Sequence, residues 1–142
     1  MNIGLVIADA GRARIFATER LGSPLENIKD LTNPYGKQRE QSFTSDRSGH
    51  TNSPSGTGHT MSNKAEFKAM EDEQFAKSIV SELEENYRDG KFVAVYLLAA
   101  PRFLGRLRNV LTPAMKKVVV REYAKDFSLM NERELQKHLA LL

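Results

Sequence analysis

The chain has 142 residues, of which 40% are hydrophobic, and a formal net charge of +3. This size and apolar content suit one domain over residues 1–142. The absence of cysteine excludes disulfides, thiolate metal sites and thiol catalysis. No apolar stretch approaches the roughly 20 residues of a membrane-spanning helix. The opening MNIGLVIADAG lacks the basic start of a signal peptide, so we expect a cytoplasmic location.

The first part of the chain predicts three strands in a meander. Residues 3–8 are apolar and include β-branched side chains, which is typical of a strand. The Asp9-Ala10-Gly11 turn leads into a returning strand at residues 14–18. Residues 25–31 are bracketed by prolines and predict the third strand.

A Ser, Gly and Thr-rich stretch follows at residues 36–62. It holds six Ser, four Gly and four Thr. Such a stretch buries too little apolar surface to offset the entropy lost when it is ordered. We therefore expect an exposed, flexible loop here. His50 and His59 lie in this stretch without a carboxylate at ligand spacing, so no metal site is predicted.

A long helix is expected next. Asn63 with Glu66 forms a capping-box pattern at its start, and Asp89-Gly90 is a typical end. The large apolar residues predict one buried face, made of Phe67, Met70, Phe75, Ile79, Leu83 and Tyr87.

The second half alternates strands with helices. Residues 92–98 are apolar on both faces, as in a buried parallel strand, and a helix follows at residues 102–111. Thr112-Pro113 predicts a short turn before a strand at residues 118–123. A final helix begins at Asn131, with apolar positions Leu135, Leu139 and Leu142.

This β-β-β-α-β-α-β-α order indicates an α/β fold with a single mixed sheet and helices packed on it. A ribonuclease-H-like arrangement has this order, and so does the middle domain of class-1 peptide release factors and Pelota-type ribosome-rescue factors.

Basic side chains concentrate after the buried strand. Between residues 101 and 125 there are seven basic residues and one acidic residue, Glu122. A helix that begins at the carboxyl edge of a sheet brings N–H groups and arginines to one place, which favours anions such as phosphate. The alternative is pairing of these arginines with acids of the same chain, such as Asp9, Asp126 or Glu122. The candidates for anion or RNA binding are Arg12, Arg14, Arg102, Arg106, Arg108, Lys116 and Lys117.

Asp9 is the one first-strand acid that a metal-dependent nuclease of ribonuclease-H-like fold could use. The strand at residues 92–98 supplies no partner carboxylate, and the neighbouring edge is basic. We therefore expect Asp9 to be a turn residue and predict no catalytic residue, metal or cofactor.

Four segments carry a family resemblance: VIADAGRARIF (6–16), SDRSG (45–49), LAAPRFLGRLR (98–108) and KDFS…NERELQKHL (125–139). With them the chain resembles the bacterial host-attachment protein family, whose members are described as required for attachment to host cells. The resemblance implies a fold similar to the release-factor and Pelota middle domain. The catalytic Gly-Gly-Gln of release factors is missing, because Gln38 and Gln41 lack flanking glycines.

Three hypotheses for function follow from the sequence. The first is a non-enzymatic interaction module that acts from the cytoplasm and affects attachment indirectly. The second is an RNA- or ribosome-associated factor that uses the basic residues and the loop. The third and most remote is a metal-dependent nuclease. The partner and the oligomeric state are left open.

Overall fold

The computed structural model describes residues 2–34 and 57–142, with side chains of the long helix described from residue 64. Five strands and four helices with assigned bounds follow in the order β1 (Ile3–Ala8), β2 (Arg12–Thr18), β3 (Glu26–Thr32), α2 (Thr57–Arg88), β4 (Ala94–Ala99), α3 (Pro101–Val110), α4 (Pro113–Val118), β5 (Val119–Tyr123) and α5 (Glu132–Leu139). Within these ranges, no helix combines the length and apolarity needed to cross a membrane.

The strands form one mixed sheet in the order β3-β2-β1-β4-β5. β1 pairs antiparallel with β2, and β2 pairs antiparallel with β3. β4 is parallel to both of its neighbours, β1 and β5. The predicted α/β class with a single mixed sheet is confirmed. The strand expected at residues 92–98 is β4, which begins two residues later and lies between β1 and β5.

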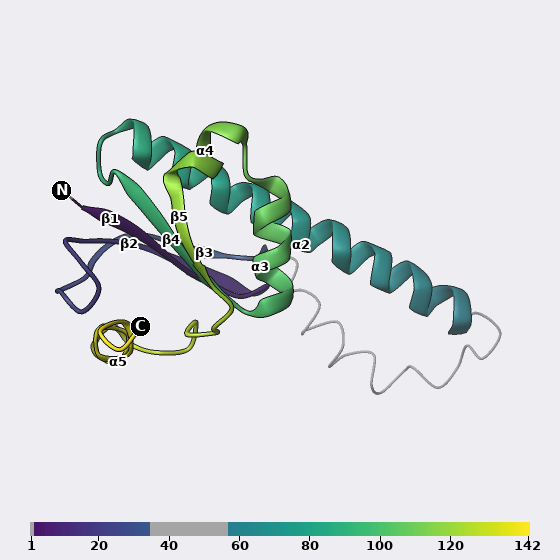
Figure 1. Ribbon diagram of the computed structural model, residues 1–142. Helices are drawn as coiled ribbons and strands as arrows, with labels where there is room; N and C mark the ends of the chain where they lie inside the picture. Colours follow the sequence, from purple (N-terminus) through teal and green to yellow (C-terminus); the bar gives the residue numbers. More distant parts are fainter. Residues whose placement is uncertain (1, 35–56) are drawn as a thin grey trace.

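Helices cover both faces of this sheet (Figure 1). Successive side chains of a strand point to opposite faces. Leu97 of β4 therefore packs in the cluster formed with α2, α3 and α4, whereas the adjacent Leu98 packs with Leu135 and Leu139 of α5. Continuous apolar sequence in β1 and β4 is explained by burial on both sides.

A close approach between β1 and the segment before β4 requires a glycine. A Cβ built on Gly4 would lie 2.8 Å from ring atoms of Phe92, whose side chain is fully buried. The ring of Phe92 thus packs directly on the backbone of β1, in space that any larger residue at position 4 would fill.

The long helix differs from its prediction in two ways. It begins at Thr57, before the expected cap Asn63, so residues 57–62 are helical; the remainder of the predicted flexible loop, residues 36–56, lies outside the described residues. The predicted buried face is wrong for three members, because Phe67, Met70 and Tyr87 are exposed.

Phe67 and Met70 are exposed because of the helix period together with the length of α2. At 3.6 residues per turn, Phe67 lies on the side of α2 opposite Ala76 and Leu83, which face the sheet. The first part of α2 also runs beyond the edge of the sheet, where none of the described strands covers it (Figure 1).

The remaining helices agree closely with the sequence. Thr112 caps α4 by accepting from the N–H of Met115, so the expected short turn is a helix of six residues. Asn131 and Glu134 form the expected capping box of α5. Leu135 and Leu139 are buried, whereas Leu142 is exposed.

Candidate functional site

The first candidate residues lie on α3, which begins directly after β4 at the carboxyl edge of the parallel strands. Arg102 is exposed in the first turn of α3. Arg106 follows one turn later and is half-buried, with Nη1 3.5 Å from the carbonyl oxygen of Ala69 on α2. Arg102 is therefore available to solvent, while Arg106 links the two helices.

Arg108 is engaged within the molecule. Its Nε donates to Oε1 of Glu122 at 2.7 Å, and its Nη2 forms an ion pair with the same oxygen at 2.5 Å. The side chains of Arg108 and Glu122 are 57% and 28% exposed, so water screens the pair. Of the two alternatives left open by the sequence, internal pairing holds for Arg108.

Lys116 and Lys117 are exposed on α4, away from Arg102. α3 runs back from the end of β4, so α4 lies near the start of the parallel strands, where Val119 pairs with Val95. The basic residues between positions 101 and 125 are therefore distributed over both ends of the sheet. These residues are close in sequence but do not form one cluster, because the ten-residue helix α3 separates Arg102 at its start from Lys116 and Lys117 on α4.

Arg12 and Arg14 start β2 but differ in surroundings. Arg12 is exposed. Arg14 is half-buried on the α5 side, and its Nη2 donates to the carbonyl oxygens of Phe127 and Ser128 at 3.3 and 3.1 Å. Its guanidinium also lies 5.7 Å from the ring centre of Phe16. Arg14 therefore holds the segment after β5 onto the sheet.

Asp9 is a turn residue, as the sequence predicts. Its Oδ1 accepts hydrogen bonds from the N–H groups of Gly11 and Arg12, both at 2.8 Å. Its Oδ2 lies 2.8 Å from the hydroxyl of Ser128. Within residues 2–34 and 64–142, no group of three or more His, Asp or Glu side chains could hold a metal ion.

Ser128 is the centre of a small polar cluster that the sequence arguments missed. It is 3% exposed, and its hydroxyl lies 2.5 Å from Oδ1 of Asp126 as well as near Asp9. A buried hydroxyl between two carboxylates rigidifies the ends of the segments that carry them. In the sequence, only the segment Lys125-Asp126-Phe127-Ser128 points to this cluster. The contact of Ser128 with Asp9 cannot be predicted from residue spacing, because the two residues are 119 positions apart.

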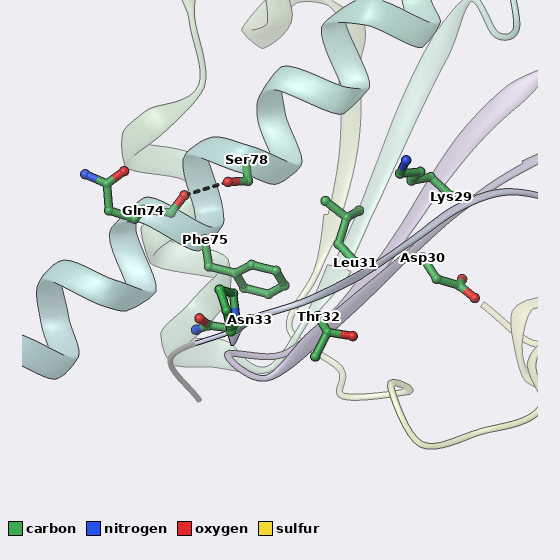
Figure 2. A pocket seen from close by; sticks show the side chains of 9 residues that line it. Lys29, Asp30, Leu31, Thr32, Asn33, Gln74, Phe75 and Ser78 are labelled. Atoms are coloured by element: carbon green, nitrogen blue, oxygen red, sulfur yellow. Dashed lines mark hydrogen bonds between the residues drawn. The ribbon is translucent and has the colours of Figure 1, made fainter. Parts of the chain in front are cut away.

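A hollow of about 400 Å³ lies between the end of β3 and α2 (Figure 2). Leu31 and Phe75 point toward each other across it, while Gln74 and Ser78 line it from α2. No sequence pattern indicates this hollow, because it depends on the distance between α2 and the edge of the sheet.

The chain matches the family described as "Protein required for attachment to host cells" over residues 5–139. It belongs to this family. The matched residues include nearly all of the described elements, from β1 to α5. Membership in the host-attachment family supports a role related to attachment. The resemblance expected from the four sequence segments is thereby confirmed.

Two individual proteins are similar to this member of the host-attachment family. An uncharacterized protein of Rickettsia prowazekii (strain Madrid E), RP470, is 34% identical over 62 residues, which are 42% of this chain and 41% of the rickettsial one. The archaeal translation termination factor aRF1 is a distant structural neighbour, with a TM-score of 0.40 and 19% identity over 94% of this chain and 33% of aRF1. From so distant a neighbour no function is transferred.

Proposed function

We propose that this host-attachment protein is a non-enzymatic module that binds another protein, acts from the cytoplasm and influences attachment indirectly. The observation that carries this proposal is the exposure of two large apolar residues on α2. Phe67 and Met70 are 64% and 63% exposed and stand one helical turn apart, on the side turned away from the sheet.

An aromatic ring and a methionine side by side in water are typical anchors of protein interfaces. Both lie in the N-terminal half of α2, on a side other than the one that packs on the sheet. Burial of the two side chains in a complex contributes about 1.5–3 kcal/mol for each of them if it is complete.

The experiment replaces both anchors by serine, Phe67→Ser with Met70→Ser, in the bacterium that carries this chain. We expect the partner recovered with the unchanged protein by crosslinking to be lost, and attachment to host cells to fall to the level of a deletion strain. Lys68→Ser, an exposed neighbour on the same helix turn, is the control and should retain both. Full attachment by the folded double variant contradicts the proposal.

The location is tested separately by fractionating the cells with an antibody against this protein. The proposal expects the protein in the cytoplasmic fraction. Labelling of the protein on the surface of intact cells contradicts an action from inside.

A second candidate function is binding to RNA or the ribosome, favoured by Arg102 and Arg106. They are four residues apart on α3, so they share one helix face at the carboxyl edge of the sheet. If several phosphates are contacted, affinity for RNA falls steeply with salt. Arg102→Gln with Arg106→Gln should flatten that slope, whereas Lys116→Gln with Lys117→Gln at the other end should not. An absence of RNA binding at low salt contradicts this candidate.

A further inference from the structure

The two faces of the sheet are covered by very different amounts of helix. α2, α3 and α4 lie on one face, where α2 alone buries Phe75, Ala76, Ile79, Val80 and Leu83. Of the described helices, only α5 lies on the other face (Figure 1). It buries Leu135 and Leu139 there, while Phe127 and Met130 of the preceding segment are only half-buried. The cover of this second face therefore depends mainly on two leucines of one short helix.

α5 is too short to be stable without its contact with the sheet. Its eight residues are fewer than an isolated helix needs to persist in water. The capping box of Asn131 and Glu134 supports its first turn. Burial of two leucines does not exceed the entropy that is lost when eight residues are ordered. We therefore expect α5 to lose its helical structure when it leaves the sheet, so that docking and helix formation are one cooperative step.

Residues 124–142, here called the α5 strap, are also joined to one another. The ring centres of Phe127 and His138 lie 5.6 Å apart, so the segment before α5 contacts the helix itself. The N–H groups of Met130 and Leu141 donate to carbonyl oxygens within the strap. All five described strands precede the strap in the chain, so its release breaks no pairing of the sheet.

Polar side chains attach the strap to the sheet at two places. At the first, Arg14 donates to the carbonyl oxygen of Ser128 at 3.1 Å, and the hydroxyl of Ser128 lies 2.8 Å from Oδ2 of Asp9. At the second, Nε2 of Gln136 donates to the carbonyl oxygen of Gly22 at 3.0 Å, in the turn between β2 and β3. Release of the strap has to break these contacts and to expose the two leucines.

We propose that the α5 strap opens from the sheet as one unit while the sheet, α2, α3 and α4 stay folded. Regions with few buried apolar contacts open at a lower free energy than the core of the same protein. The open form uncovers the sheet residues beneath α5, namely Leu5, Ile7, Phe16 and Leu98. This face of the sheet therefore exists in a covered and an exposed form. The inference does not rest on the proposed protein-binding role, because Phe67 and Met70 lie outside the strap.

Two adjacent leucines of β4 provide a matched test, because the chain has no cysteine of its own. Leu97 and Leu98 are both fully buried, but Leu97 packs with α2, α3 and α4, and Leu98 packs with α5. We expect dithionitrobenzoate to label Leu98→Cys at least about tenfold faster than Leu97→Cys under native conditions. Equal labelling rates overturn the proposal, because both thiols would then be reached only when the whole chain unfolds.

A substitution on the opposite face separates opening of the strap from global unfolding. Ile79 of α2 is fully buried there, and Ile79→Val destabilises the closed and the open form of the strap alike. It should therefore raise the labelling of Leu97→Cys about two- to twelvefold and leave that of Leu98→Cys unchanged. An equal rise for Leu98→Cys overturns the proposal. Ser128→Ala removes an attachment of the strap and should raise the labelling of Leu98→Cys about five- to thirtyfold. An unchanged rate contradicts the part assigned to Ser128.

Amide hydrogen exchange of the unchanged protein serves if the cysteine variants fail to fold. The N–H groups of residues 135–140 should exchange at least about tenfold faster than those of β4, and with one common dependence on denaturant. Rates that increase step by step from residue 135 to residue 140 would indicate fraying of the helix end and overturn the proposal. Exchange of residues 135–140 that slows as the protein concentration rises would assign the cover of this face to a second copy and also overturn it.

Discussion

The hydroxyl of Ser128 lies 2.8 Å from Oδ2 of Asp9, and this contact joins positions 119 residues apart. Asp9 follows β1 directly, while Ser128 belongs to the segment between β5 and α5. Because Arg14 donates to the carbonyl oxygen of Ser128 from the neighbouring strand, both contacts fix this segment against the sheet. They precede α5, whose own Leu135 and Leu139 pack on the same face of the sheet.

Ser128→Ala is expected to destabilise the fold by about 1–2 kcal/mol, because it removes a buried hydroxyl from between two carboxylates. Urea unfolding followed by circular dichroism measures this change. Leu129→Ala, at a neighbouring position that is 79% exposed, should change the unfolding free energy by less than about 0.5 kcal/mol. Equal effects of the two substitutions would show that the Ser128 contact is not stabilising.

Gly4→Ala is expected to destabilise the protein by about 1–3 kcal/mol, since the added methyl group meets the Phe92 ring at 2.8 Å. Gly105→Ala is the matched control: a Cβ there meets nothing within 4 Å, and alanine favours the helix. The control should therefore raise the stability by about 0.5–1 kcal/mol. Both values come from thermal or urea unfolding, and a neutral Gly4→Ala would contradict the close packing described for β1.

The strands of this fold could be predicted from the sequence because they are local patterns. The runs at residues 3–8 and 92–98 are apolar and include β-branched residues, and burial on both sheet faces accounts for most of them, whereas Val93 lies before β4 and is exposed. The same holds for the cap of α5, where Asn131 and Glu134 satisfy each other's backbone groups.

The candidate site was less predictable because it depends on relations that sequence spacing does not carry. Large apolar side chains on α2 predicted a buried face, yet Phe67 lies on the side of the helix opposite Ala76 and Leu83 and is exposed. Seven arginines and lysines were grouped by sequence position and composition, whereas the fold pairs Arg108 with Glu122 and turns Arg14 to the opposite face. The Ser128 cluster and the β3–α2 hollow arise from tertiary contacts alone.

The Arg108–Glu122 pair should contribute little to stability and more to the charge of the α3 surface. Glu122→Gln is expected to cost less than about 1 kcal/mol, because both partners are partly exposed and screened. It frees the guanidinium of Arg108, so any RNA affinity should rise and its salt dependence should steepen. The measurement is RNA binding at several salt concentrations, with Glu132→Gln on α5 as an exposed control. An identical rise in the control would assign the effect to net charge alone.

Arg12 and Arg14 should separate a binding role from a structural one, although both begin β2. Arg14→Gln is expected to lower the unfolding free energy by about 1–3 kcal/mol, since it removes a charged donor from the carbonyl oxygens of Phe127 and Ser128. Amide hydrogen exchange should then accelerate over residues 126–130, which these bonds hold in place. Arg12→Gln, at an exposed position, should leave both the stability and the exchange unchanged. Arg14 is assigned as the residue that holds the segment between β5 and α5 on the sheet. Accelerated exchange in Arg12→Gln, or unchanged exchange in Arg14→Gln, would contradict this assignment.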